Sequence, residues 1–230
     1  MAISYRPEEG NRPTSRAEYS LYCKKARELG YESMAAAAAL AFELVQRVWD
    51  VFGIPDPVLA EGARARLNMN RGIKWEDYRP GVSIRVTQSK TGKPIIIPLV
   101  DWGEDGQRIF LYPELEAQLA RVRPPAACGL IVVEERTGRG YKHRRMTTVH
   151  RRICDAAGLP KDMKFTGFRH GGATEIGDAG EADIRSISGH SQLNTAAIYN
   201  KASQDKARRV GHLRRAHIAQ ITGSDEVLSE

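Results

Sequence analysis

Two β-branched runs in the middle of the chain constrain its fold more than any other feature. "VSIRVTQSK" and "PIIIPLV" are rich in Val and Ile and are separated by "TGK", which places Gly92 in a turn. Such a pair predicts a β-hairpin, because β-branched side chains favour strands and glycine favours tight turns. "IKWEDY", just before the first run, is a candidate third strand. We therefore expect a small antiparallel sheet over about residues 73–99.

Helical patterns precede this sheet. Ser15 and Glu18 have the spacing of a capping box, which predicts a helix that begins there and ends near Gly30. A second, buried helix is predicted from Ser33 to about Phe52. Its apolar positions fall at helical spacing: Leu40, Leu44, Val48 and Val51.

The rest of the chain is also predicted to be mainly helical. "YPELEAQLARVRPP" indicates a helix that its two prolines end, and Thr147 or Thr148 is a candidate cap for a helix that ends at Gly158. Helical patterns then continue toward the C-terminus. The predicted fold class is therefore α+β, mainly helical, with the small sheet packed beside a helical core.

Length and composition fit a single soluble domain with a basic surface. We expect a linker at 1–13, one domain at 14–220 and a flexible tail at 221–230. No apolar run is long enough to span a membrane, and the three cysteines have neither a disulfide framework nor metal-ligand spacing, so we expect a cytoplasmic protein. The excess of 35 Lys and Arg over 28 Asp and Glu, a net charge of +7, favours a polyanionic partner.

One stretch, "FTGFRHGGATE", places Arg169 and His170 among small residues. This is either a phosphate-binding arginine on a helix or an ordinary exposed basic pair. Cleaving a phosphodiester without a metal needs a nucleophile, cations over the non-bridging oxygens, and an acid for the leaving oxygen. Arginine suits the second task, because its planar fork bonds two oxygens and keeps its charge. Spacing to other residues has to decide between the two interpretations.

Downstream of that pair stand Gly189, His190 and, nine residues further, Tyr199. Together with Arg169-His170 this order resembles the second signature of the tyrosine recombinases, or phage integrase family. The family pattern also has an arginine with an acidic residue three positions later, and a lysine at a hairpin turn. "LVQRVWDVF" supplies the first pair, Arg47 and Asp50, and "VTQSKTGK" supplies Lys90. The resemblance covers about residues 14–218.

The resemblance implies a role for each of five residues. Tyr199 would attack a DNA phosphate to form a 3′-phosphotyrosyl link, and Arg47 and Arg169 would hold the non-bridging oxygens. Lys90 would protonate the leaving 5′-oxygen, and His190 would hydrogen-bond the phosphate. No metal and no cofactor is implied. The expected partners are double-stranded DNA and, in the full-length protein, further copies in a synaptic tetramer, with no membrane.

One departure from the family pattern lies at Thr166, where the family has a histidine. The threonine hydroxyl could still bond the phosphate, His170 could contribute instead, or the site could be weakened. The family also often has a histidine at the second position, packed behind the site, so we expect His170 and Asp50 to support the site. The alternative function is a recombinase-like domain that binds DNA without cleaving it. A topoisomerase-like relaxing enzyme is a more distant possibility.

Two further expectations concern the periphery of the domain. We expect the family's N-terminal helical domain to be absent, with only a short linker before the catalytic domain. "GRGYKHRR" is predicted to contact DNA through Lys142, Arg144 and Arg145, whereas "KARRVGHLRR" is expected to be a solvated face or a helix that packs on a neighbouring protomer. His150, His212 and His217 are expected to be surface or core residues, not ligands.

Overall fold

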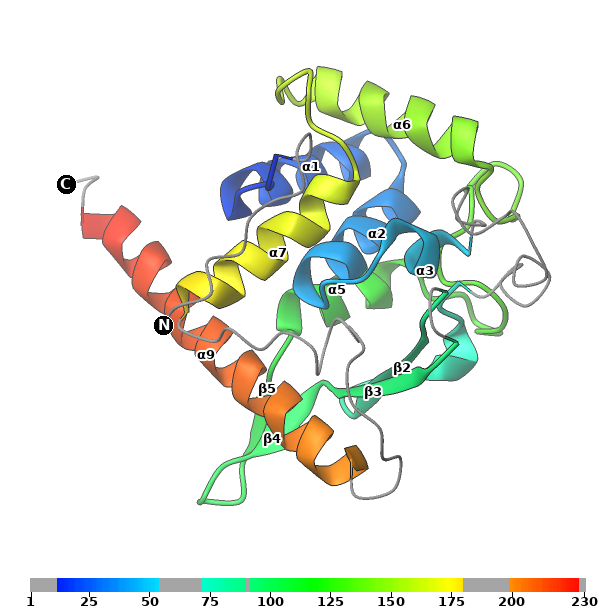
Figure 1. Ribbon diagram of the computed structural model, residues 1–230. Helices are drawn as coiled ribbons and strands as arrows, with labels where there is room; N and C mark the ends of the chain where they lie inside the picture. The colour runs from blue at the N-terminus through cyan, green and yellow to red at the C-terminus, as the bar shows by residue number, and fades with distance from the viewer. Residues whose placement is uncertain (1–11, 54–71, 90–91, 180–198, 228–230) are drawn as a thin grey trace.

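The computed structural model describes residues 12–53, 72–89, 92–179 and 199–227, with the backbone alone described for 199–206 and 222–227. The helices in chain order are α1 (Arg16–Glu28), α2 (Glu32–Glu43), α3 (Val48–Phe52), α5 (Pro113–Val122), α6 (His143–Ala156), α7 (Thr166–Asp178) and α9 (Tyr199–Val227). The strands and the short 3-10 helix between α3 and α5 are η1 (Trp75–Asp77), β1 (Tyr78–Arg79), β2 (Ser83–Thr87), β3 (Pro94–Pro98), β4 (Val100–Trp102) and β5 (Arg108–Phe110). Figure 1 shows the helices grouped on one side and the strands on the other, with α9 running along their edge. The predicted mainly helical α+β fold is confirmed.

Helix α2 is the centre of the helical group. Every residue from Ser33 to Glu43 is buried, and most of them are alanines. Alanine is the best helix former and its side chain is a single methyl group, so neighbouring helices can approach closely on all sides. Helices α1, α5 and α7 pack on α2, and α9 packs on α7 (Figure 1).

The predicted helix from Ser33 to Phe52 is wrong in one respect, because it is broken between α2 and α3. Val45 has a positive φ of 55°, in the left-handed region, and Arg47 is the extended N-cap residue of α3. In a continuous helix the carbonyls of Phe42 and Glu43 would accept from the backbone four residues on. Here Nη1 of Arg214, far along the chain, donates to both carbonyls. A distant side chain thus replaces the local bonds, which the apolar spacing could not reveal.

The predicted antiparallel hairpin is present, and its surroundings differ from the prediction in two respects. Strands β2 and β3 pair with Val86 opposite Ile95, and Gly92 has a φ of 69°, as its place in the turn requires. The candidate strand "IKWEDY" is instead mostly the 3-10 helix η1, followed by the two-residue β1. A second two-stranded sheet, β4–β5, follows directly and was not predicted.

Helix α6 extends beyond its predicted start, and the helical pattern predicted toward the C-terminus is one long helix within the described residues. Helix α6 begins at His143, not at the threonines, because Thr147 and Thr148 donate to the carbonyls of His143 and Arg144 inside the helix instead of capping its end. Helix α9 passes through Gly211 and continues to Val227. Within the described residues, no helix is both long and apolar enough to cross a membrane.

Candidate active site

Arg47 and the β2–β3 hairpin are held together by Asp50. The Asp50 side chain is fully buried, and its Oδ2 lies 3.6 Å from Nη1 of Arg47. Its Oδ1 accepts a 2.6 Å hydrogen bond from the backbone N–H of Ser89, the residue directly before Lys90. One carboxylate therefore fixes the spacing between the arginine and the strand end that leads to the lysine. The Arg47 side chain is 16% exposed, so its guanidinium is largely dry but still reachable.

Arg169 is positioned by an unusually close contact between α7 and its neighbours. A Cβ added at Gly172 would lie 1.9 Å from the carbonyl oxygen of Phe42, and one at Gly171 would lie 1.9 Å from that of Thr14. Only glycine fits at either position, because any other side chain would overlap backbone atoms. Arg169 lies one helical turn before Gly172, on the part of α7 that packs on α2. The two glycines thus bring the Arg169 helix against the end of α2, five residues before Arg47.

The other predicted site residues are described to different extents. Lys90 and His190 lie outside the described residues, and so do their contacts. Tyr199 is the first residue of α9 and is described by its backbone alone. Thr166 is the first residue of α7 and is partly exposed, whereas His170 is 8% exposed. The structure therefore brings together Arg47, Asp50 and the hairpin, and it sets the helices of Arg169 and Tyr199 beside each other.

Sequence reasoning missed a group of charged residues beneath this site. Arg214 is 1% exposed, and its Nε donates a 2.7 Å hydrogen bond to Oε1 of Glu175. Arg16 donates from Nε and Nη2 to both oxygens of Glu175, at 2.6 Å each, and from Nη1 to Glu43 at 3.3 Å. Arg214 belongs to the run "KARRVGHLRR", for which the sequence predicts a solvated face or a contact with a neighbouring protomer. The signal that identifies it is periodicity: it falls in line with the buried positions Ala207, Val210 and Ile218.

The contacts in this group shift the pKa of Glu175 and that of Arg16. Burial alone would raise the pKa of Glu175, but the hydrogen bond from Arg16 and the charge of Arg214 outweigh it, and the pKa is lowered. Burial alone would likewise lower the pKa of Arg16, but Glu175 and Glu43 outweigh it, and the pKa is raised. The shifts of Glu175 and Arg16 both favour the charged form, and by contacts the two arginines and two glutamates form two matched pairs.

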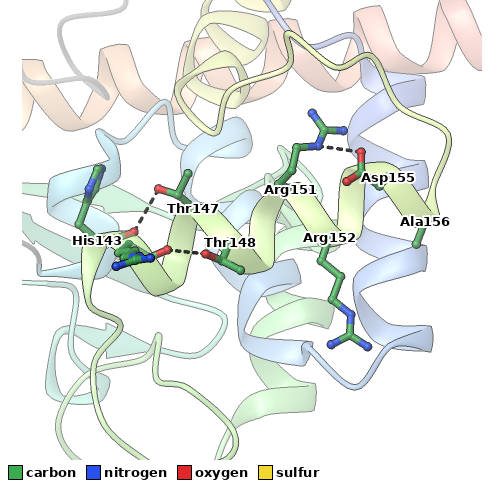
Figure 2. A pocket seen from close by; sticks show the side chains of 8 residues that line it. His143, Thr147, Thr148, Arg151, Arg152, Asp155 and Ala156 are labelled. Atoms are coloured by element: carbon green, nitrogen blue, oxygen red, sulfur yellow. Dashed lines mark hydrogen bonds and ion pairs between the residues drawn. The ribbon is translucent and has the colours of Figure 1, made fainter.

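The predicted DNA-binding residues surround the start of α6, where the structure separates them. Lys142 and Arg144 are exposed, and within the described chain neither side chain makes an ion pair. Arg145 is less available, because its Nε donates a 2.8 Å bond to Glu134. Figure 2 shows the open depression along this helix, lined at one end by His143, Thr147 and Thr148.

At the far end of the same depression, the two arginine side chains hydrogen-bond to other groups of the protein. Arg151 bonds Asp155 at 2.9 Å and the carbonyl of Lys161 at 2.9 Å, while Arg152 points the other way and bonds the hydroxyl of Tyr31 at 3.1 Å (Figure 2). At the N-terminal end of this surface, Lys142 and Arg144 are exposed and have no carboxylate partner among the described residues, whereas Arg151 pairs with Asp155 and Arg152 bonds a hydroxyl.

The histidines behave as expected where they are described. His150 is a core residue: one ring nitrogen lies 3.2 Å from the hydroxyl of Tyr22 and the other 3.1 Å from the carbonyl of Met163. Burial lowers the pKa of His150 to about 4, so the ring is neutral at pH 7. His212, on α9, is half-exposed and pairs with Asp101 of β4 at 2.7 Å. Among the described residues, no cluster of His, Cys, Asp or Glu is arranged to hold a metal ion.

Comparison with known proteins now bears on this arrangement. No family model matches the sequence. The chain is 26% identical over 158 residues to the tyrosine recombinase XerD of Corynebacterium glutamicum, which corresponds to 66% of this chain and 49% of the relative. It thus spans about half the length of that relative.

Three solved structures share the fold. The lambda integrase catalytic core matches with a TM-score of 0.53 and 22% identity, covering 79% of this chain and 96% of that one. A lambda integrase dimer bound to a COC′ core site matches at 0.54 with 20% identity over 84% of this chain and 64% of that one. The XerA recombinase matches at 0.53 with 15% identity, covering 96% of this chain and 66% of that one.

The fold is therefore that of the integrase-type catalytic domain. In sequence, the chain is related to the tyrosine recombinases through XerD, so the resemblance that its motifs predicted is confirmed.

Proposed function

We propose that this chain is the catalytic domain of a site-specific DNA recombinase that cleaves and rejoins duplex DNA. The observation that carries the proposal is the Asp50 carboxylate, which joins Arg47 to the backbone of Ser89 beside Lys90. A buried acid that fixes Arg47 relative to the backbone preceding Lys90 supports a site in which both cations serve one scissile phosphate.

In the proposed reaction, the hydroxyl of Tyr199 loses its proton to water, its oxygen attacks the phosphorus and the bond to the 5′-oxygen breaks. Arg47 and Arg169 hold the two non-bridging oxygens, and His190 hydrogen-bonds the phosphate. Lys90 gives its proton to the leaving oxygen, so the products are a 3′-phosphotyrosyl link and a free 5′-hydroxyl. A second 5′-hydroxyl then attacks the link and frees the tyrosine. Because the link keeps the energy of the phosphodiester, rejoining needs no nucleotide cofactor.

A nicked suicide substrate tests this reaction directly. Wild-type protein is expected to form a covalent protein–DNA adduct that survives denaturing electrophoresis, with and without EDTA, and Tyr199→Phe to form none. Tyr31→Phe is the matched control, because it removes a phenol hydroxyl that bonds Arg152 on the other side of the domain, and it should react as wild type. Adduct formation by Tyr199→Phe would refute the assignment, and its loss in EDTA would refute metal independence.

The second candidate function is DNA binding without cleavage. It is favoured by Thr166, since a threonine hydroxyl is a poor base where the family has a histidine. Thr166 is the partly exposed first residue of α7. A large gain in adduct formation by Thr166→His would favour a decayed site, whereas an unchanged rate would favour a competent threonine site.

DNA is the proposed partner, and self-association on DNA is proposed with it. Support comes from the exposed cations Lys142 and Arg144 at the start of α6 and from the lambda integrase structures, one of them a tetramer bound to a Holliday junction with a TM-score of 0.54. Phosphate contacts of this kind supply affinity without sequence information. We place the reaction in the cytoplasm, where chromosomal or phage DNA is available.

A further inference from the structure

Helices α7 and α9 carry residues of the proposed catalytic set, and α2 precedes another such residue. One buried side chain of α9 contacts both α7 and α2. Arg214 belongs to α9, which begins at Tyr199. Its Nε donates to Glu175 of α7, the helix of Arg169. Its Nη1 donates to the last carbonyls of α2, those of Phe42 and Glu43, just before the segment that ends at Arg47.

The contact with α2 is a helix cap supplied from a distant part of the chain. The last four carbonyls of a helix have no partner within it, and a cation near them also complements the helix dipole. The guanidinium of Arg214 meets both needs for α2, and it lies over the ring of Phe42 with 5.1 Å from its central carbon to the ring centroid. The position of the Arg214 guanidinium therefore depends on where α2 ends. The end of α2 in turn sets where the segment that leads to Arg47 begins.

The charge of Arg214 is balanced locally, which makes the contact specific. Glu175 and Glu43 face Arg214 and Arg16, so the buried set is neutral only when α9 is seated. Removing one member leaves an uncompensated charge in a dry site, which is far more costly than losing an exposed pair. The helix that carries Tyr199 is thus held in one position and not in a range of positions.

The position of α9 at Arg214 affects Tyr199 because the two residues are far apart on the same helix, so a small tilt at one displaces the other. Tyr199 lies about 22 Å from Arg214 along α9, at a rise of 1.5 Å per residue. A tilt of about 3° at Arg214 would move the Tyr199 end by about 1 Å, and a misplacement of that size can cost about 100-fold in rate. Arg208 and His212 meet Asp101 between the two points, but these contacts are partly exposed and therefore yield more easily.

We propose that Arg214 is a positioning residue that couples the seating of the Tyr199 helix to the helices of both phosphate-binding arginines. It acts through Glu175 on α7 and through the carboxyl end of α2. This assignment rests on the proposed recombinase function for its catalytic consequence, while the seating itself can be measured without any activity.

The experiment compares Arg214→Lys, Glu175→Gln and the matched control Arg215→Lys in the full chain. Lysine keeps the charge, but the three donors of its ammonium sit on one nitrogen and cannot span Glu175 and the two carbonyls as the planar guanidinium does. Arg215 is adjacent and pairs with Glu114 at 2.7 Å, but its side chain is 37% exposed. Hydrogen exchange by mass spectrometry follows each helix, and the nicked substrate at saturating concentration gives the adduct rate next to a separately measured DNA affinity.

For Arg214→Lys we expect faster exchange in α9 and at the carboxyl end of α2 with unchanged protection of α1, an adduct rate lowered by about 100-fold, and an unchanged DNA affinity. Glu175→Gln should also speed exchange in α9 and lower the adduct rate, each by less than Arg214→Lys does. Arg215→Lys should match wild type.

Unchanged exchange and adduct rate in Arg214→Lys would overturn the proposal, and so would an equal loss of protection throughout the domain. If wild type itself forms no adduct, the recombinase function fails, whereas the exchange comparison still decides whether Arg214 seats α9.

Discussion

Two arginine-rich stretches of nearly the same composition differ in burial: one presents its cations to solvent, and the other buries an arginine in the core. "KHRRMTTVHRR" forms α6, where Lys142 and Arg144 face solvent, and "KARRVGHLRR" lies in α9, where Arg214 is 1% exposed. The difference is register. Arg144 lies on the outer face of α6, opposite the buried side chains of Met146, Val149, His150, Ile153 and Cys154. Arg214 lies on the inner stripe of α9 and meets Glu175 and Glu43. The meaning of a basic run therefore depends on which face of its helix each cation occupies.

The largest effect that separates the two stretches is expected from a pair of substitutions to methionine. Arg214→Met should lower the free energy of unfolding by about 3–5 kcal/mol, because it leaves Glu175 and Glu43 sharing only Arg16 in a buried site. Arg144→Met should stay within about 0.5 kcal/mol of wild type. Urea unfolding followed by circular dichroism measures both, and equal losses in the two variants would break the comparison.

Glu175→Gln should have the next largest effect, about 1.5–3 kcal/mol at pH 7, because it removes hydrogen bonds to two charged groups. It also changes the pH dependence. The folded pKa of Glu175 is lowered by its arginine partners, so its contribution is present above the unfolded pKa and is lost as the pH falls through the folded value. Urea midpoints between pH 7 and pH 3 should therefore fall less in the variant than in wild type. A parallel fall in both proteins would contradict the matched-pair description.

The inner face of α6 offers a neutral counterpart to Arg214 in His150. Its folded pKa is about 4 and lies below the usual value, so the unfolded chain takes up the proton first as the pH falls. Stability should drop by about 2 kcal/mol between pH 7 and pH 5 on account of this group. His150→Gln, which can still donate to the carbonyl of Met163, should remove that part of the pH dependence. An undiminished slope in the variant would show that His150 is not its source.

The smallest effects should appear on DNA affinity at the outer face. Arg144→Ala should reduce the slope of log affinity against log salt by about 1, as expected for one lost phosphate contact. Arg145→Ala should change the slope less, because its guanidinium already pairs with Glu134. Fluorescence anisotropy with duplex DNA at several salt concentrations measures both. Identical slopes for the two variants would remove the distinction between exposed and paired cations on α6.

Much of the fold follows from local patterns, and the exceptions share one physical cause. The Ser15 capping box and the hairpin with Gly92 are satisfied by neighbours in sequence, so both could be predicted. The break after α2 could not, because the carbonyls of Phe42 and Glu43 are satisfied by Arg214, more than 150 residues later. The late start assigned to α6 had a different origin, since threonine hydroxyls can bond inside a helix as well as cap it.

For the site, spacing identified which residues to examine but not how they are held. Arg47, Asp50 and Arg169 follow from the family resemblance, and their order alone predicted them. The bond from Ser89 to Asp50 and the contact of Gly172 with Phe42 could not be predicted, because each joins elements whose relative placement only the fold determines. The roles of Lys90, His190 and Tyr199 stay predictions.

The alanine-built helix α2 has a consequence for how such a domain tolerates change. Neighbouring helices contact the methyl groups of α2, and α7 approaches it and the Thr14 backbone through Gly171 and Gly172. The distances between these elements are therefore set by main chains, which cannot rearrange as side chains do. A saturation library over α2 and this glycine pair should return few functional members, while the outer positions of α6 should accept most polar residues. Redesign of a domain of this kind is therefore a matter of its surface, and its interior has to be left intact.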